Sequence, residues 1–485
     1  MSAAPAASAR VAPDRMLADI ADYVLDHTQF HGLAFETARL CLIDGLGCAL
    51  QALDHPECTK LLGPLVPGTL VPHGARVPGT PYQLDPVSAA FDLGSMIGWL
   101  DFHDTWPAAG WCHPSDGIGA ILMTANWLSR RAAANGRPAP HMRDVLNAMV
   151  QAHEIQGMLA LGDSRHAGGV DRVALVKVAS AALVSRLLGL DRDALLDALS
   201  LAWLDGPALR NGGRLGDAGA GRRWAAGDAS SRGVRLALMV RAGEAGCATA
   251  PGVPARGRGD SDVEPAEFGP PRAWGSHVME NVLFKPAFAA DLHAQTAVEA
   301  ALALHARLGA DGRGACDIER VTIHAPAACL RRLDRQGALH DATQRERCIQ
   351  YMVAVALLHG RLTPADYADA VAADPRIDAL RARIGCVEDA RFGGDRDDAQ
   401  ARSMGSAVGV LLQDGSALPE VLVEQPLGHK LRRGDGIPLL EQKFRAGLAR
   451  RCAPRQQQAI AHVSLDTARL AQMPVHEYVD LYCPQ

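Results

Sequence analysis

Hydrophobic positions in the first part of the chain recur with a helical period. From Arg15 to about Leu204, apolar residues return every three or four positions, as in Ala38-Leu40-Cys41-Ile43-Leu46. This spacing places them on one face of a helix. The pattern predicts helices over about 117–135, 142–162, 173–189, 192–204 and 224–242. Residues 55–86 contain seven prolines, which predicts an ordered loop or arm between helices.

After about residue 280 strand-like alternation appears among the helices. Residues 318–324 alternate, and 407–412 are joined through Asp414-Gly415 to 420–424, which predicts a β-hairpin. Further helices are expected at 288–307, 343–358, 363–372, 376–384, 437–451, 455–470 and 474–482.

These patterns predict a mainly α protein with two domains. A large all-helical domain would be formed by both chain ends, residues 1–279 and 434–485. A smaller α+β domain, residues 280–433, would be inserted into it.

Composition supports tightly packed helices. Of the 485 residues, 48% are hydrophobic and only 5% aromatic, with alanine and leucine dominating. The net charge of −5 argues against a nucleic-acid or membrane-surface binder. No apolar run is long enough to span a membrane, and residues 1–13 read as a frayed terminus without the apolar core of a signal peptide. We therefore expect a cytoplasmic protein with no nucleic-acid or membrane partner.

The cysteines and the sequence motifs indicate no cofactor. The eleven cysteines are irregularly spaced and include no Cys-x-x-Cys pair, so a zinc site or an iron–sulfur cluster of the usual kind is not expected. No P-loop, nucleophile elbow or His-Glu-x-x-His motif is present. The sequence predicts neither a metal nor an organic cofactor.

A dense polar cluster lies between two apolar runs, residues 89–100 and 118–128. It comprises Asp101, His103, Asp104, Thr105, His113, Ser115 and Asp116. Burying titratable groups between core-directed segments costs free energy unless the groups are paired or take part in chemistry. We therefore interpret the cluster as part of an active site. His113 could act as acid, base or anion ligand beside a helix N-terminus. The alternative is that these groups cap helix ends, which we expect for Ser115 and Asp116.

Two lysines stand in apolar runs. Lys177 lies in Val173–Ala179, and its side chain could simply reach solvent. Lys285 follows Asn281–Phe284 at the expected domain junction, where pockets form preferentially. His293 could share its site.

Arginines in or beside the glycine-rich stretch 205–222 could bind carboxylates through bidentate pairs. They are Arg210, Arg222, Arg223 and Arg232. Each could equally be a solvated surface charge. Tyr351, in an aliphatic helix, is either a catalytic phenol or a core tyrosine with a satisfied hydroxyl.

Several motifs together resemble the MmgE/PrpD superfamily over nearly the whole chain. They include Leu100-Asp101-Phe102, His113-Pro114-Ser115-Asp116, His153-Glu154-Ile155-Gln156-Gly157, Trp224-Ala225-Ala226-Gly227-Asp228, Asn281-Val282-Leu283-Phe284-Lys285, His293-Ala294-Gln295-Thr296-Ala297 and Asp435-Gly436-Ile437-Pro438. Within the superfamily the chain is most similar to the dehydratases that act on 2-methylcitrate in propionate catabolism.

The resemblance implies a helical domain with a smaller α+β lid, a homodimer, and a site between the domains. It implies conversion of 2-methylcitrate to 2-methyl-cis-aconitate in the methylcitrate cycle, with action on citrate or cis-aconitate also possible for such a site. Active-site positions of related cis-aconitate decarboxylases match Asp101, Thr105, His113, Lys285 and Tyr351. The expected catalytic residues are those five, and the expected substrate-binding residues are Arg210, Arg223, Arg232 and His293.

Dehydration requires a proton to be removed next to a carboxylate and a hydroxyl to be protonated as it leaves. Without an iron–sulfur cluster, side chains must supply both steps. His113 or Asp101 would move the proton. Lys285 and an arginine would neutralise carboxylates, with Tyr351 and Thr105 orienting them.

Two departures from the family pattern keep other functions open. Relatives usually carry Phe-Pro-Ala-Glu or Phe-Pro-Ala-His where this chain has Phe288-Ala289-Ala290-Asp291, and the loops 210–222 and 252–257 also diverge. The alternatives are cis-aconitate decarboxylation or an epimerisation, and a non-catalytic paralogue that only binds a tricarboxylate.

Overall fold

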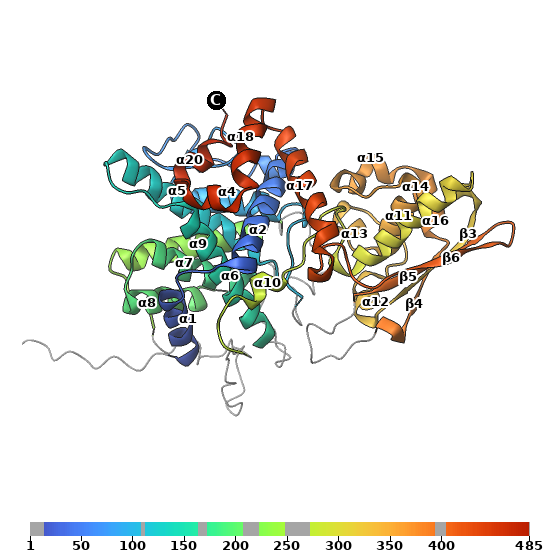
Figure 1. The fold of residues 1–485 in the computed structure, drawn as a ribbon, viewed down its shortest axis with the longest axis horizontal. Coiled ribbons are helices and arrows are strands. Elements are labelled where there is room, and N and C mark those ends of the chain that lie inside the picture. Colours follow the sequence, from blue (N-terminus) through green and yellow to red (C-terminus); the bar gives the residue numbers. More distant parts are fainter. Residues whose placement is uncertain are drawn as a thin grey trace, which may run out of the picture. The chain divides into compact units, whose positions relative to one another are not determined.

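The computed structural model describes residues 14–107, 112–162, 172–206, 223–247, 272–392 and 404–484. The chain forms two compact units. Unit 1 comprises residues up to Trp99, Ala108–Glu280 and Gly447 onward, and unit 2 comprises Leu100–Pro107 and Asn281–Ala446. Helices dominate, so the mainly α prediction is confirmed (Figure 1). The domain boundaries near 280 and 433 stay a prediction.

Unit 1 is helical, and small residues let its central helices approach closely. At its centre α4 (Pro86–Gly98) packs on α9 (Ala225–Arg241). A Cβ on Gly227 would lie 2.5 Å from the carbonyl oxygen of Phe91, so only glycine fits at this crossing. Buried Ala90, Ala120 and Val234 belong to the apolar cluster around it.

Unit 1 contains further helices in its described residues. They are α1 (Arg15–Asp26), α2 (Gly32–Ala52), α3 (Pro56–Thr59), α5 (Ile118–Ala134), α6 (Met142–Gly162), α7 (Arg172–Leu187), α8 (Arg192–Leu204), α10 (His277–Asn281), α18 (Pro454–Ser464), α19 (Thr467–Gln472) and α20 (Val475–Asp480). The proline-rich segment 55–86 contains α3 and a short antiparallel pair, β1 (Ala75–Arg76) and β2 (Gln83–Leu84).

Unit 2 is built on a four-stranded sheet with the order β4-β3-β5-β6. The strands are β3 (Ile318–Ala325), β4 (Ile384–Glu388), β5 (Ser406–Leu412) and β6 (Ala417–Val423). The pairs β3–β5 and β5–β6 are antiparallel, and β3–β4 is parallel. The predicted hairpin is therefore confirmed as β5–β6, whereas β4, a short strand containing Gly385, was not predicted from the pattern.

Helices of unit 2 pack on the sheet and on one another. They are α11 (Gln295–Ala310), α12 (Ala327–Leu333), α13 (Ala342–Arg345), α14 (Ile349–His359), α15 (Asp369–Ala372), α16 (Pro375–Arg381) and the part of α17 (Arg433–Ala449) that ends at Ala446. Helix α11 contacts β5 and β6, and α14 contacts α11 and α16.

Several predicted helices have different bounds, and in four of them a cap or an extended residue interrupts the expected helix. The helix expected from 288 begins at Gln295, because the Asp291 side chain caps a separate 3₁₀ turn, η5 (Leu292–Ala294). The helix expected from 343 is split by extended Cys348. The one expected over 363–372 is split at Ala368 into η7 (Pro364–Tyr367) and α15. The one expected over 455–470 ends at Ser464, because Asp466 caps α19.

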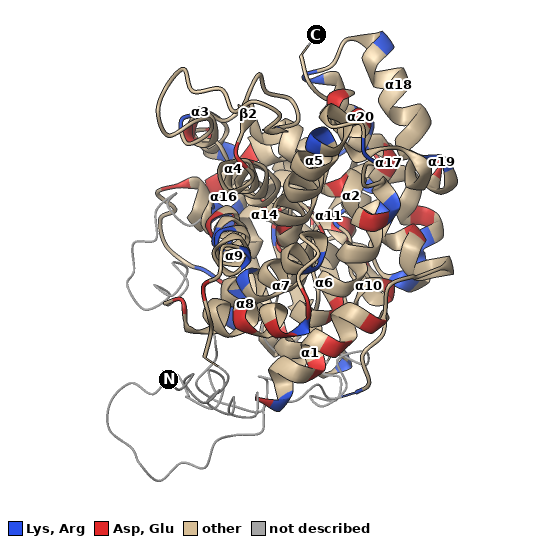
Figure 2. Cartoon of the chain, turned by 90° about the vertical axis from the view of Figure 1, so that its left-hand side faces the viewer, with Lys and Arg blue, Asp and Glu red and all other residues tan. Residues whose placement is uncertain are grey.

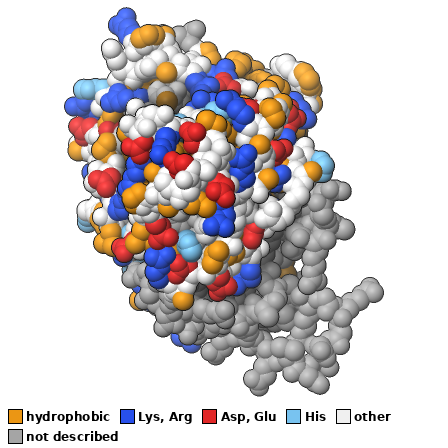
Figure 3. Space-filling view, turned by 90° about the vertical axis from the view of Figure 1, so that its right-hand side faces the viewer, with side chains coloured by type: hydrophobic (Ala, Val, Ile, Leu, Met, Phe, Trp, Pro, Cys, Tyr) orange, Lys and Arg blue, Asp and Glu red, His pale blue; other side chains and the backbone are white. Residues whose placement is uncertain are grey.

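Charged side chains of both signs are interspersed on the surface. Figure 2 shows mainly acidic residues along α1, which has one arginine at its start, whereas helices such as α14 and α11 are drawn almost entirely in tan. The face drawn in Figure 3 mixes apolar, acidic and basic side chains without a broad patch of one sign. Among the described residues, no helix is both long enough and apolar enough to cross a membrane.

One glycine of unit 2 allows a close approach of two backbone segments. The Phe284 amide donates to the Gly428 carbonyl oxygen at 3.3 Å. A Cβ on Gly428 would lie 1.9 Å from the carbonyl oxygen of Phe284, and backbone atoms cannot yield to it. We expect Gly428→Ala to lower the free energy of unfolding by about 2 kcal/mol, measured by denaturant titration. The control is Gly434→Ala in α17, where a Cβ meets open space. Equal midpoints for the two variants would contradict the close approach.

Candidate active site

An ion pair in unit 2 joins Asp101 to Lys285. The Lys285 Nζ donates to the Asp101 carbonyl oxygen at 2.6 Å and to its Oδ1 at 2.7 Å. The lysine is 1% exposed, whereas the Asp101 side chain is 46% exposed. Asp101 has a φ of +46°, a left-handed conformation that is unfavourable for a residue with a side chain. The same ammonium therefore neutralises the carboxylate and holds its backbone in a strained conformation.

A short antiparallel bridge aligns the two segments that carry this pair. The Thr105 amide donates to the Leu283 carbonyl oxygen at 2.8 Å, and the Leu283 amide donates back to Thr105 at 2.9 Å. This register places Thr105, which is buried, two positions from Lys285 along the paired segment. The structure thus brings together three residues predicted from the sequence.

A second ion pair extends the charged cluster. The Arg332 Nε donates to the Asp291 Oδ2 at 2.9 Å, and the Asp291 Oδ1 accepts the His293 amide at 3.0 Å. Burial opposes ionisation of Asp291, but the charge of Arg332, with a smaller contribution from Lys285, lowers the pKa of this carboxyl. The Arg332 side chain is 42% exposed; partial desolvation opposes its charge, yet Asp291 and, to a smaller extent, Asp101 raise its pKa. Each of the two carboxylates, Asp101 and Asp291, therefore has a cationic partner here.

Two tyrosines lie beside one another in unit 2. The rings of Tyr351 and Tyr367 are stacked with centroids 6.0 Å apart. The Tyr351 hydroxyl donates to the Asp366 carbonyl oxygen at 2.7 Å, and the Tyr367 hydroxyl donates to the Ala289 carbonyl oxygen at 2.5 Å. Burial raises the pKa of Tyr351 to about 12. Both of these phenols therefore keep their proton at neutral pH and already bond to backbone.

Tyr367 is the more strongly perturbed of the two phenols. Burial raises its pKa well above the usual value, and the charges of Glu346, then Asp291 and Asp101, contribute less. Sequence reasoning missed this residue, as it missed the pairing of Arg332 with Asp291. The local pattern offered no signal for either, although it contains the capping box that starts η7, in which Thr363 donates to the Asp366 Oδ2 from its amide at 2.8 Å and its hydroxyl at 2.7 Å.

His293 is held neutral in the folded protein. Burial lowers the pKa of its imidazole to about 4, although Asp291 opposes the shift. The unfolded chain, with a histidine pKa near 6.5, binds more protons than the folded chain between these values. Stability therefore falls as pH drops from about 6.5 to 4. The free energy of unfolding is measured at pH 4.5 and at pH 7. We expect the drop between the two pH values to be smaller in His293→Gln than in the wild type, by at most about 3 kcal/mol. Exposed His340 supplies the control His340→Gln, and equal pH dependence in both variants would contradict a neutral imidazole at the half-buried His293.

His113 begins the second half of the polar cluster and belongs to unit 1. It precedes η1 (Pro114–Gly117), and its carbonyl oxygen accepts the Asp116 amide at 3.0 Å. The side chains of other helices hold this turn, because Gln156 of α6 donates to the Pro114 carbonyl oxygen at 3.0 Å and Ser230 of α9 donates to that of Asp116 at 2.7 Å. The half-buried His113 thus precedes a turn that hydrogen bonds from α6 and α9 hold at the start of α5.

The capping role expected for Ser115 and Asp116 is wrong. The residues at the N-cap positions of η1 and α5 are His113 and Gly117, and neither helix has a side-chain cap bond. The Ser115 hydroxyl instead lies 3.5 Å from the Nε2 of His153. For Ser115, this tertiary partner is one that the local spacing could not show.

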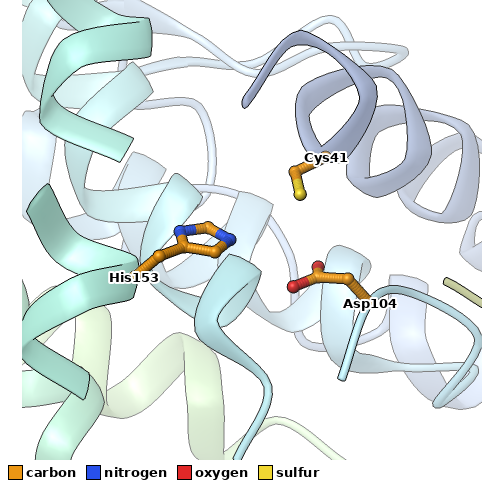
Figure 4. A group of neighbouring side chains, drawn as sticks. All are labelled: Cys41, Asp104 and His153. Atoms are coloured by element: carbon orange, nitrogen blue, oxygen red, sulfur yellow. The ribbon is translucent and has the colours of Figure 1, made fainter. Parts of the chain in front are cut away.

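His153 in turn is held inside unit 1. Its Nδ1 lies 2.8 Å from the Met149 carbonyl oxygen, which makes this nitrogen the donor and leaves Nε2 as an acceptor for Ser115. A ring nitrogen of His153 and the Sγ of Cys41 lie within 4.8 Å, and both residues are buried (Figure 4). Asp104, also labelled in Figure 4, belongs to unit 2.

The candidate substrate-binding arginines that are described bond to protein groups. The Arg232 Nε donates to the Asp205 Oδ2 at 2.7 Å, and the Arg223 Nη1 donates to the Trp99 carbonyl oxygen at 2.7 Å. Lys177 is 3% exposed and 3.4 Å from the same Asp205 oxygen, so the expectation that it reaches solvent is wrong. Arg210 lies outside the described residues, as do the loops 210–222 and 252–257.

Comparison with known proteins identifies the family. The MmgE/PrpD N-terminal domain model matches residues 18–267, and the MmgE/PrpD C-terminal domain model matches residues 288–467. A 2-methylcitrate dehydratase of Cupriavidus necator is 56% identical over 99% of this chain and 100% of the relative. One of Salmonella typhimurium is 55% identical over 97% of each chain. A mitochondrial 2-methylcitrate dehydratase of Yarrowia lipolytica is 46% identical over 99% of this chain and 92% of the relative. Together with the paired motifs of both units, these matches establish that the chain belongs to the MmgE/PrpD family.

Proposed function

We propose that this protein is a hydro-lyase that converts 2-methylcitrate to 2-methyl-cis-aconitate in propionate catabolism, and that citrate and cis-aconitate are further substrates. The observation that carries the proposal is the Asp101–Lys285 pair, with its buried ammonium and half-exposed carboxylate. Its support is the near full-length similarity to relatives named 2-methylcitrate dehydratase.

The reaction breaks one C–H and one C–O bond and forms a C=C bond. The proton goes to a base, and the hydroxyl leaves as water after it accepts a proton. Negative charge develops on the carboxylate next to the reacting carbon, and a fixed cation stabilises it most where solvent is excluded. The Lys285 ammonium has that character, because it is buried and pre-positioned by Asp101.

We assign the remaining roles by chemistry. His113 or Asp101 moves the proton, and Thr105 and Tyr351 orient the substrate. Arg210, Arg223, Arg232 and His293 stay proposed substrate-binding residues. Because Arg232 and Arg223 already bond to Asp205 and to the Trp99 backbone, a substrate carboxylate would compete for or share their donors. The proposal invokes no metal or organic cofactor, since the sequence lacks the thiolate spacing of a cluster.

One assay tests the function. Purified protein treated with a chelator is mixed separately with 2-methylcitrate, citrate and cis-aconitate, followed by ultraviolet absorbance of the new double bond and by mass spectrometry. We expect absorbance to rise with 2-methylcitrate and the product to be lighter by one water. Carbon dioxide release from cis-aconitate without dehydration would instead establish a decarboxylase. Calorimetric binding of 2-methylcitrate without turnover would establish a non-catalytic paralogue.

We also propose that the protein is a cytoplasmic homodimer. Static light scattering should then give a mass twice the 51.3 kDa of one chain. A mass of one chain at micromolar concentration would contradict the dimer.

A further inference from the structure

Lys443 is a buried lysine in the unit 2 part of α17 that no motif singled out. It is 7% exposed. Its Nζ donates to the Phe102 carbonyl oxygen at 2.6 Å and to the Lys285 carbonyl oxygen at 3.1 Å. The same Nζ stands 3.8 Å from the centroid of the Phe102 ring. The ammonium therefore bonds to both backbone segments of the candidate site.

Each acceptor adjoins a member of the Asp101–Lys285 pair. Phe102 directly follows Asp101, and the second acceptor is the backbone of Lys285 itself. The Lys285 side chain then returns to Asp101. The contacts form a closed ring from Lys443 to Phe102, Asp101, Lys285 and back, so a shift of either segment stretches a bond to the other.

We propose that Lys443 is a positioning residue for the Asp101–Lys285 pair, an inference that rests on the proposed dehydratase function. A left-handed non-glycine residue such as Asp101 persists only where its surroundings over-determine it. Lys285 fixes the Asp101 carbonyl, and Lys443 fixes the next one along the chain. Reaction rates depend steeply on such placement, since a displacement of about 1 Å costs roughly 100-fold.

Buried charge explains why a lysine serves here. An ammonium in an apolar surrounding needs hydrogen-bond acceptors, and the two carbonyl oxygens and the Phe102 ring supply them. Removing the ammonium would take this hydrogen-bond donor away from both carbonyl oxygens. The backbone of both segments would then relax, and the Asp101–Lys285 pair would move with it.

The test compares Lys443→Met, which keeps the side-chain length but removes the donors, with Lys443→Arg, which keeps charge and donors. The matched control is Arg445→Met, which removes an exposed cation from the same helix. The readouts are kcat and KM for 2-methylcitrate and hydrogen–deuterium exchange of peptides covering 100–107 and 281–287. We expect Lys443→Met to lower kcat by about 10- to 100-fold with KM changed less than about threefold, and Lys443→Arg to recover part of kcat. Exchange should rise in both peptides for Lys443→Met and stay unchanged for Arg445→Met.

The outcomes separate this inference from the proposed function. Unchanged exchange in both peptides, or unchanged kcat, in Lys443→Met would overturn the positioning role. If the wild-type protein does not dehydrate 2-methylcitrate, the proposed function fails and the exchange data alone decide whether Lys443 holds the two segments. If Lys443→Met yields no soluble protein, Lys443→Gln, which keeps a shorter donor, is measured with the same expectations.

Discussion

Replacing Lys285 with methionine is expected to lower kcat for 2-methylcitrate by about 1,000-fold, because a buried, pre-positioned cation is worth this much at a developing negative charge. Methionine fills a similar volume, so packing around the 1% exposed side chain is retained. Steady-state kinetics, with circular dichroism to verify the fold, measure the effect.

The control for this variant is Lys430→Met. Lys430 is an exposed lysine of the same unit that donates to the Asn281 Oδ1 at 2.7 Å, and its loss should leave kcat unchanged. The pair of Lys285 and Asp101 adds a second criterion. Because the two side chains form one ion pair, their losses should not add. The kcat of Lys285→Met/Asp101→Asn should therefore be at most about tenfold lower than the kcat of Lys285→Met alone. A Lys285→Met enzyme within threefold of wild type would contradict the assignment.

His113→Ala is the second variant with a large expected effect. General acid–base groups contribute about 100- to 10,000-fold, so kcat should fall within that range. The bell-shaped pH profile of kcat/KM should also lose one of its two limbs, because one titrating group is gone. Initial rates across pH 5.5–9 measure both.

The control for His113→Ala is His31→Ala. His31 is an exposed histidine of unit 1 that makes no side-chain cap bond to α2. It should keep the wild-type rate and profile. If His113→Ala keeps full turnover, the proton transfer belongs to another group, and Asp101, the alternative base, would be examined through Asp101→Asn.

Periodicity was informative where a helix buries one face over many residues. The helix predicted over 142–162 is observed as α6 with the same bounds, and 192–204 as α8. It failed where a polar side chain interrupts an apolar run. The Asp291 side chain accepts a hydrogen bond from the His293 amide and caps a short 3₁₀ turn, so α11 begins only after that turn. The apolar pattern does not show whether a carboxylate will make such a bond. The strand β4 was missed because its pairing partner, β3, lies about 60 residues earlier in the chain.

For the candidate site, Lys285 could be found from the sequence because a lysine in an apolar run is costly unless it is paired. Asp101 and Thr105 could be found because polar groups cluster between two core-directed runs. Tyr367, Arg332 and Lys443 gave no such signal. Each matters through a partner far along the chain, as Lys443 does through Phe102, 341 positions away.

The sequence by itself determined the helical class, the hairpin, the family resemblance and the residue types of the site, because these depend on local periodicity and on the cost of placing charge among apolar residues. Only the tertiary structure decided which partner each charge has. Lys285 could have paired with any carboxylate, and Lys177 could have reached solvent. Folding placed Lys285 on Asp101 and Lys177 on Asp205. The physical reason is that a hydrogen bond or ion pair needs atoms within about 3 Å, and contacts at that range between distant segments follow from the packing of the whole unit, which local pattern does not contain.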